Sequence, residues 1–224
     1  MTMRTRGRMV LLALVLLAWP LAASSAAAST DELRTHSITL QEYDFSCGAA
    51  VISTILTYYF GEPVTEQEVI LGIARETDMA KVLTRRAFSL LDMKRFAQAR
   101  GYQAVGYRMD LDFLGELNQP VIVPVSFRSN KHFVVFKGIV GDLVVIADPA
   151  LGNYTMRVAD FLAVWTEGGG GIGADSDRRT GPRRRYGVGF ILERAHPQGP
   201  LTEEDRARQA RFMATRNLSM LVTL

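Results

Sequence analysis

One cysteine is the residue of this 224-residue chain best suited to covalent chemistry. Cys47 follows Ser46 and opens an apolar run that ends at Phe60, just before Gly61. A Ser N-cap and a Gly stop predict a buried helix over this run, with Cys47 in its first turn. The unpaired N–H groups of that turn stabilise a thiolate, the nucleophilic form. The residue alone leaves two interpretations open, an activated nucleophile or a packed, inert cysteine.

A histidine and an aspartate stand where they could serve this thiol. Of the three histidines, His36 and His196 fall in polar flanking segments and are expected at the surface, whereas His132 begins a strand-like run. Asp148 ends a neighbouring apolar run, directly before Pro149. Cysteine, histidine and aspartate together make a nucleophile, a base and an orienting acid. Taken singly, His132 is typical of a strand edge and Asp148 of a turn.

The hairpin expected around Gly141-Asp142 brings His132 and Asp148 to one end of a sheet, but not automatically to one face. A plain two-residue loop would pair Asp148 with Val135 and turn its side chain away from the imidazole. We therefore predict an odd-length loop, a bulge, or an Asp148 that turns beyond the strand end. A strict two-residue hairpin with an outward Asp148 would refute the orienting role.

Gln41 stands six residues before Cys47 and completes the candidate set. Its side-chain amide could donate a hydrogen bond to a developing oxyanion, with the backbone N–H of Cys47 as the second donor. A lone glutamine carries no such meaning, so this role depends on the other three residues.

Helical patterns fill the first half of the chain that must position these groups. After the helix over 47–60, Thr65 and Glu68 form a capping box that opens a second helix. A third helix is expected over 84–100, and a short one over 111–117. The apolar face of the third helix is expected to hold Leu83, Phe88, Leu91 and Phe96.

Strand-like runs fill the second half. They are β-branched and apolar, and they cover 121–125, 132–139, 143–147 and 186–192. Helices first and strands later predict an α+β fold. The candidate domain is 29–196; within it, 166–185 is expected to be a Gly/Arg-rich loop, and beyond it a charged tail, 197–224, is expected to be helical or disordered.

The first 28 residues have the three parts of an export signal. Arg4, Arg6 and Arg8 precede an apolar run of eleven residues, and Ala26-Ala27-Ala28 offers a cleavage site. An uncleaved anchor stays open as the alternative. Removing the three arginines takes the formal net charge from +3 to zero, so charge gives no support for nucleic-acid binding. The single cysteine excludes a disulfide scaffold and a Cys-rich zinc site.

The chain resembles the C39 family of papain-like cysteine peptidases, which includes the leader-peptide-cleaving domains of bacteriocin exporters. The resemblance covers about residues 36–165 and rests on QEYDFSCGAA from Gln41, HFVV from His132, and Asp148-Pro149. The order of the four residues and the sixteen-residue step from His132 to Asp148 match. Ser46 departs from the family pattern, because many members carry Asp directly before the cysteine.

The resemblance implies a papain-like fold, with the cysteine helix packed on an antiparallel sheet, and no cofactor or metal. It also implies that Gln41 serves the oxyanion hole, Cys47 is the nucleophile, His132 the base and Asp148 the orienting residue. The chain looks more like the stand-alone exported members, such as those encoded with secreted functional-amyloid systems, than like the exporter fusions.

The function predicted from these patterns is that of a periplasmic or secreted cysteine endopeptidase. Its partner would be a peptide or protein substrate, a co-secreted protein or a leader peptide, with no nucleic acid and with a membrane only if the signal segment stays uncleaved. Two alternatives stay open: a transglutaminase-like acyl transferase, and a catalytically inactive module that keeps a peptide-binding groove.

Overall fold

The computed structural model describes residues 30–127, 130–168, 186–195 and 201–214. The expected signal segment and His196 therefore lie outside the described residues, as do most of the Gly/Arg-rich segment and the end of the tail. Within the described ranges, no helix combines the length and the apolar character needed to cross a bilayer.

A six-stranded antiparallel sheet forms the centre of the molecule, in the order β1-β6-β2-β3-β4-β5. The strands are β1 Tyr102–Asp110, β2 Val121–Phe127, β3 Asn130–Val140, β4 Leu143–Asp148, β5 Gly152–Arg157 and β6 Tyr186–Arg194. The four predicted strands are confirmed as β2, β3, β4 and β6. The prediction missed β1 and β5, which are the two edge strands of the sheet.

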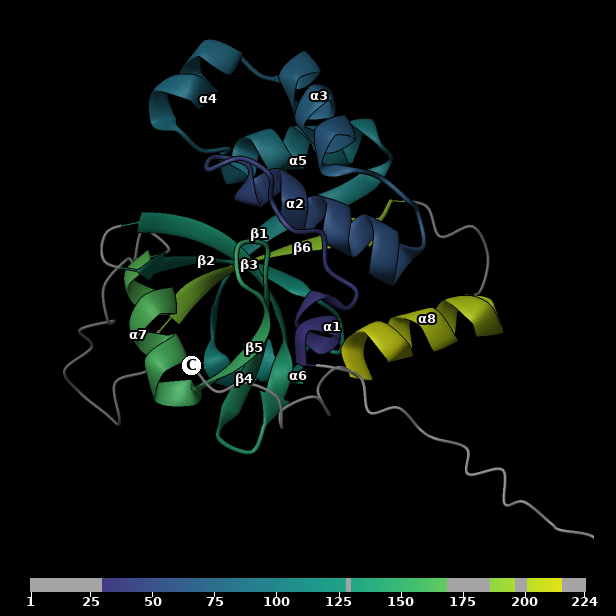
Figure 1. Cartoon of the computed structure of the whole chain (residues 1–224), viewed down its shortest axis with the longest axis vertical. Helices are drawn as coiled ribbons and strands as arrows, with labels where there is room; N and C mark the ends of the chain where they lie inside the picture. The colour runs from purple at the N-terminus through teal and green to yellow at the C-terminus, as the bar shows by residue number, and fades with distance from the viewer. Residues whose placement is uncertain (1–29, 128–129, 169–185, 196–200, 215–224) are drawn as a thin grey trace, which may run out of the picture.

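Helices cover both faces of this sheet (Figure 1). They are α1 Thr30–Thr35, α2 Cys47–Thr54 with its π-helical continuation η1 Ile55–Phe60, α3 Glu66–Glu76, α4 Met79–Arg85, α5 Leu90–Ala99, α6 Leu111–Glu116, α7 Val158–Gly168 and α8 Glu203–Ala214. The segment from α2 to α5 lies over one face and α7 over the other. The prediction of an α+β fold is confirmed.

Two hydrophobic cores lie between the sheet and these helical layers, one on each face of the sheet. The core on the α2 side joins Val51, Ile52, Val69, Ile73 and Phe96 of the helices to Ile122, Val135 and Ala147 of the sheet. The core on the α7 side joins Phe161 and Trp165 to Val123, Val134, Phe136 and Ile146. Successive residues of β3 and β4 thus belong to opposite cores, as the alternation of side chains along a strand requires.

The predicted cysteine helix begins at Cys47 and ends at Phe60, where Gly61 adopts a left-handed conformation with φ of 73°. Every residue of α2 is buried. Ser46 occupies the N-cap position, but its hydroxyl does not cap the helix. It donates instead to the carbonyl oxygen of Tyr43, at 2.8 Å, and so closes the loop that precedes Cys47.

The helix predicted over 84–100 is wrong as a single element. The chain forms α4 and α5 there, interrupted by Arg86 with a positive φ of 53°. Ser89 and Asp92 make a capping box that begins α5 afresh. Leu83 and Leu91 are consequently exposed, at 61% and 53%, although an inward face was expected for them. The capping box at Thr65 and Glu68, by contrast, is confirmed.

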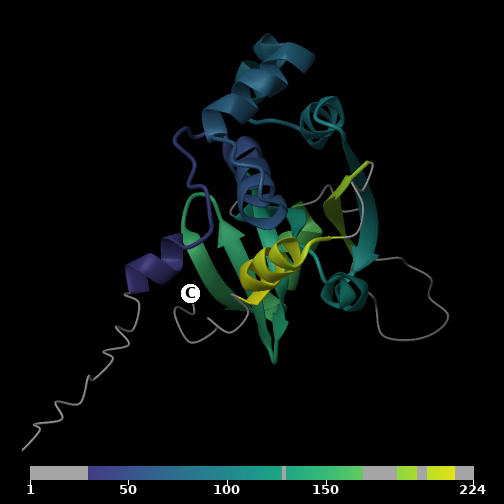
Figure 2. The same cartoon turned by 90° about the vertical axis from the view of Figure 1, so that its right-hand side faces the viewer.

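The charged tail carries a helix that packs against the domain. α8 lies next to η1, at the end of the cysteine helix (Figures 1 and 2). Phe212 is 2% exposed and belongs to the α2-side core. Arg208 donates to the carbonyl oxygen of Phe60 at 3.2 Å. On the other side of the sheet, α7 continues to Gly168, so the Gly/Arg-rich segment begins later than the expected residue 166.

Candidate active site

The β3–β4 hairpin contains the bulge that the site requires. Val140 pairs with Leu143 around a two-residue turn, but the register shifts between Phe136 and Gly138, so that Val135 pairs with Ala147. Lys137 is the extra residue. The shift moves Asp148 from the position opposite Val135 to the position opposite Val134, on the same face as His132. Of the three predicted alternatives, an odd-length loop, a bulge or an Asp148 beyond the strand end, the structure contains the bulge.

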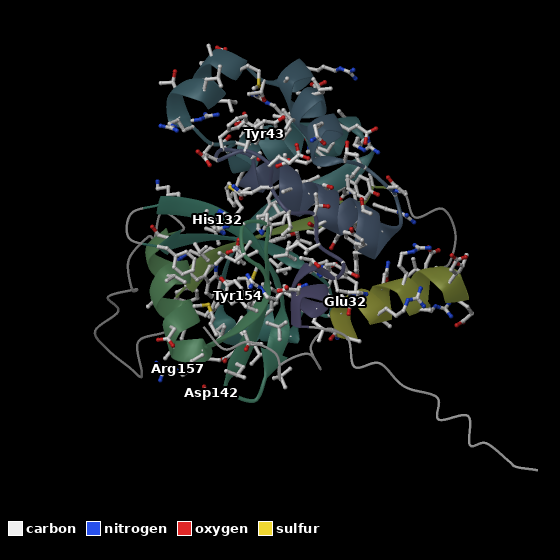
Figure 3. The ribbon with its side chains drawn as sticks, viewed as in Figure 1. Glu32, Tyr43, His132, Asp142, Tyr154 and Arg157 are labelled. Carbon is white, nitrogen blue, oxygen red and sulfur yellow. The ribbon has the colours of Figure 1, made fainter. Side chains whose placement is uncertain are left out.

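His132 and Asp148 meet as a result of this register. His132 Nε2 lies 2.8 Å from Asp148 Oδ1. The side chains are 18% and 2% exposed, respectively, so solvent screens the contact only weakly. Figure 3 shows His132 where the helical layer meets the sheet. Because Nε2 faces the carboxyl group, Nδ1 is the ring nitrogen left for the sulfur.

Cys47 is the second hydrogen-bonding partner of His132. Burial lowers the pKa of His132, but hydrogen bonds to Asp148 and Cys47 and their charges outweigh it, and together they raise this pKa from 6.5 to about 9. The imidazolium form is thus favoured at neutral pH. Cys47 is 4% exposed and is the first residue of α2, so its own N–H has no intrahelical acceptor.

The Asp148 side chain is fixed by neighbours on the following turn and strand. The N–H groups of Ala150 and Leu151 donate to Oδ1, at 2.7 and 3.3 Å. Tyr154 of β5, labelled in Figure 3, is 6% exposed. It hydrogen-bonds to the same carboxyl group. Burial, the charge of Asp148 and this hydrogen bond raise the pKa of Tyr154.

Tyr154 is a site residue that the sequence analysis missed. Its strand was not predicted, because Gly152 and Asn153 at its start are typical of turns. Alternation of Tyr154 and Met156 with polar neighbours is the signal that could have indicated a strand there. Nothing in that pattern, however, would have directed the hydroxyl toward Asp148.

Gln41 lies in the loop that leads into α2. Its backbone N–H donates to the carbonyl oxygen of Pro149, at 2.8 Å, so this loop is attached to the residue that follows Asp148. Its side-chain Nε2 donates to the carbonyl oxygen of Tyr43, at 2.9 Å. An amide nitrogen has two hydrogens, and this contact uses one of them.

A hollow of about 440 Å³ lies against the loop before Cys47. It is lined by Glu42, Tyr43, Asp44, Phe45, Leu83 and Arg86. Tyr43 and Leu83 are 45% and 61% exposed, and Phe45 packs on Tyr43 with ring centroids 5.8 Å apart. Partly exposed apolar side chains of this kind are typical of a surface that receives another molecule.

The sequence profile of the Peptidase C39 family matches residues 35–169, a range that holds all four candidate site residues. A probable functional amyloid protease FapD from Pseudomonas aeruginosa is 39% identical to this chain over 137 residues. A protein of the same name from Pseudomonas fluorescens is 42% identical over 137 residues. In both cases the match covers 61% of this chain and spans 60% of the relative's length.

The fold is similar to that of a solved peptidase domain. This domain belongs to Streptococcus ComA, a bi-functional ABC transporter involved in quorum sensing. It matches with a TM-score of 0.51 at 18% identity, over 70% of this chain and 96% of that domain. The likeness confirms the predicted papain-like arrangement of helix and antiparallel sheet.

Proposed function

The chain belongs to the Peptidase C39 family, and from this premise we propose that it is an exported cysteine peptidase that uses Cys47, His132, Asp148 and Gln41. The observation that carries the proposal is the contact of His132 with both other members of the triad. Its Nε2 lies 2.8 Å from Asp148 Oδ1, and it hydrogen-bonds to Cys47. Cys47 and His132 are 85 positions apart in the sequence, and His132 and Asp148 are 16 positions apart. These contacts thus connect the three residues at the start of α2.

The first half-reaction forms a thioester. The Cys47 sulfur attacks the peptide carbonyl carbon, and the carbonyl electron pair moves to the oxygen. The Gln41 amide and the Cys47 N–H hold this oxyanion. His132, already protonated in the resting site, gives its proton to the leaving amine as the carbon–nitrogen bond breaks.

Water completes the reaction. His132 takes a proton from the water molecule that attacks the thioester carbonyl, and the sulfur–carbon bond then breaks. The products are a carboxylic acid and the free thiolate. Asp148 holds the imidazole in position during both steps, while Ala150, Leu151 and Tyr154 hold Asp148.

The substrate class follows from the site and from the relatives. A hollow beside the Cys47 loop, lined by both apolar and charged residues, suits an extended segment of another polypeptide. Two relatives are named as probable functional amyloid proteases. We propose by analogy that this chain cleaves a peptide bond in a co-exported protein or its leader peptide.

The test is cleavage of the exported proteins encoded beside this chain. The protein is purified without residues 1–28, and each candidate substrate is incubated with wild type and with Cys47→Ala. We expect wild type alone to produce two fragments whose masses add up to the substrate plus one water. Cleavage by the Cys47→Ala variant would overturn the mechanism, and cross-linked products would indicate acyl transfer to an amine instead of hydrolysis.

A further inference from the structure

Glu66 is a buried acidic residue that faces the loop carrying Gln41. It is the first residue of α3, directly after the N-cap Thr65, and it is 2% exposed. Acidic residues at this position usually lie in solvent and interact with the helix dipole. A carboxyl group that is buried there instead needs a hydrogen-bonding partner to offset the free-energy cost of its desolvation.

The partner is the backbone of the residue that follows Gln41. The N–H of Glu42 donates to both oxygens of Glu66, at 3.0 and 3.2 Å. The side chain of Glu42 accepts from Gln67 in the same first turn of α3. The start of α3 therefore binds the Gln41-Glu42 segment through Glu66 and Gln67.

Gln41 is thus fixed between two elements of the fold. Its own N–H binds the carbonyl oxygen of Pro149, which follows Asp148. The next N–H along the chain, that of Glu42, binds Glu66. Two consecutive peptide groups with separate anchors, one on the β4–β5 turn and one on α3, leave this short segment little freedom to move.

We propose that Glu66 is a positioning residue that keeps Gln41 in place to stabilise the oxyanion. The inference rests on the proposed peptidase function. Removing the carboxyl group leaves the Glu42 N–H without its acceptor and frees one side of the segment. A displacement of about 1 Å at such a donor is enough to cost about 10²-fold in rate.

Two small reagents separate this role from a merely structural one. p-Nitrophenyl acetate acylates a cysteine: the sulfur–carbon bond forms through an oxyanion, and the bond to p-nitrophenolate breaks. Iodoacetamide alkylates the same sulfur with loss of iodide, and no oxyanion arises. A defect in the oxyanion donor therefore slows the first reaction and spares the second.

The expected result is a selective loss of acylation in Glu66→Ala. Its acylation rate should fall by about 10- to 10²-fold, with alkylation within about twofold of wild type. Gln41→Ala should show the same selectivity, with a loss of about 10²–10³. The double variant should acylate no more slowly than Gln41→Ala alone, because both changes remove one interaction.

Two further variants test the hydrogen bond itself. Glu66→Gln keeps an oxygen that can accept from Glu42, and should recover most of the acylation rate. Glu66→Asp keeps the carboxyl group but shortens the side chain by one methylene. Its acylation rate should fall while its alkylation rate stays near that of wild type. This variant keeps the test available if Glu66→Ala fails to fold. Glu68→Ala is the matched control, since it breaks the capping box of the same helix turn without touching the Gln41 loop.

The outcomes separate the two proposals. Normal acylation by wild type together with normal acylation by folded Glu66→Ala, or by Glu66→Asp, overturns the positioning role alone. Equal losses with both reagents, or an effect of Glu68→Ala as large as that of Glu66→Ala, overturn it as well. A wild-type Cys47 that reacts with either reagent no faster than a free thiol overturns the peptidase function, and the positioning role falls with it.

Discussion

At the scale of single residues, the imidazole of His132 is the group on which the site depends. Its ring contacts Asp148 on one side and Cys47 on the other. These contacts favour the cation more strongly than burial opposes it. The raised pKa favours a proton on His132 at neutral pH, and the proposed mechanism uses this proton for the leaving amine.

This pairing predicts a pH-dependent contribution to stability. The pKa of His132 is about 9 in the folded chain and 6.5 when unperturbed, so the folded state binds the proton more tightly. The contribution is fully present below pH 6.5 and is lost as the pH rises through about 9. Between pH 6 and pH 10, the free energy of unfolding should fall by about 1–3 kcal/mol more in wild type than in His132→Ala.

Urea titrations of both proteins at the two pH values measure this difference. The control is His36→Ala, because His36 is exposed and lies outside the pair. That variant should follow wild type across the whole range. Parallel pH dependences of wild type and His132→Ala would contradict the raised pKa.

At the scale of elements, the bulge in β3 places Asp148 on the same face of the sheet as His132. Lys137, the extra residue, sends a fully buried side chain toward α8, where its Nζ lies 4.1 Å from the centre of the Phe212 ring. A cation over an aromatic ring gains some of the energy lost on leaving water. Burial nevertheless lowers the pKa of Lys137 to about 7, so this strand carries an energetic cost at the position that aligns Asp148.

Replacing this lysine should stabilise the protein in a pH-dependent way. The pKa is about 7 in the folded chain and 10.5 when unperturbed, so the unfolded state binds the proton more tightly. The resulting penalty is absent above pH 10.5, grows as the pH falls, and is complete below about 7. Lys137→Met should therefore have a higher free energy of unfolding than wild type, measured by urea titration. The difference should be about 1–3 kcal/mol at pH 6.5 and much less at pH 10.5.

The exposed Lys131 of the same strand provides the control. Lys131→Met should leave the free energy of unfolding within about 0.5 kcal/mol of wild type at both pH values. A Lys137→Met variant whose stability relative to wild type does not change with pH would show that burial of the ammonium group is not the cause.

At the scale of the whole molecule, α8 supports the helix that begins at Cys47. α8 packs against η1, the continuation of α2. Arg208 of α8 and Arg194 of β6 both donate to the carbonyl oxygen of Phe60, the last residue of η1. The charged tail thus completes the α2-side core and satisfies the end of the cysteine helix, far in sequence from Cys47.

Truncating the buried aromatic of α8 tests this support. Phe212 is 2% exposed and packs against Tyr59 with ring centroids 6.0 Å apart. Phe212→Ala should lower the free energy of unfolding by about 3–5 kcal/mol, because it leaves a cavity in the core. Exposed Arg211 of the same helix is the control, and Arg211→Ala should stay within about 0.5 kcal/mol of wild type. Equal effects of the two substitutions in urea unfolding would mean that α8 does not contribute to the core.

The sequence by itself determined the candidate site and most of the elements. Caps, glycine stops and apolar periodicity are local signals, and they located Cys47 at a helix start and His132 and Asp148 on neighbouring strands. The alternation rule also limited the hairpin to an odd-length loop, a bulge or an Asp148 beyond the strand end, because face and register are coupled in a strand. The edge strands β1 and β5 and the break at Arg86 were not predicted from the sequence. Turn-like residues and an internal helix cap obscure the local patterns that would have indicated them.

Only the tertiary structure decided which distant groups serve the site. The hydroxyl of Tyr154 reaches Asp148, and the carboxyl group of Glu66 reaches the Gln41 loop, from elements whose sequence patterns indicate neither contact. The docking of Phe212 on the core likewise joins residues more than 150 positions apart. Local preferences act over one or two turns of chain, whereas such contacts depend on how complete elements pack and on strand register. The residues of the candidate site are therefore visible in the sequence, and the contacts that hold them are visible only in the folded molecule.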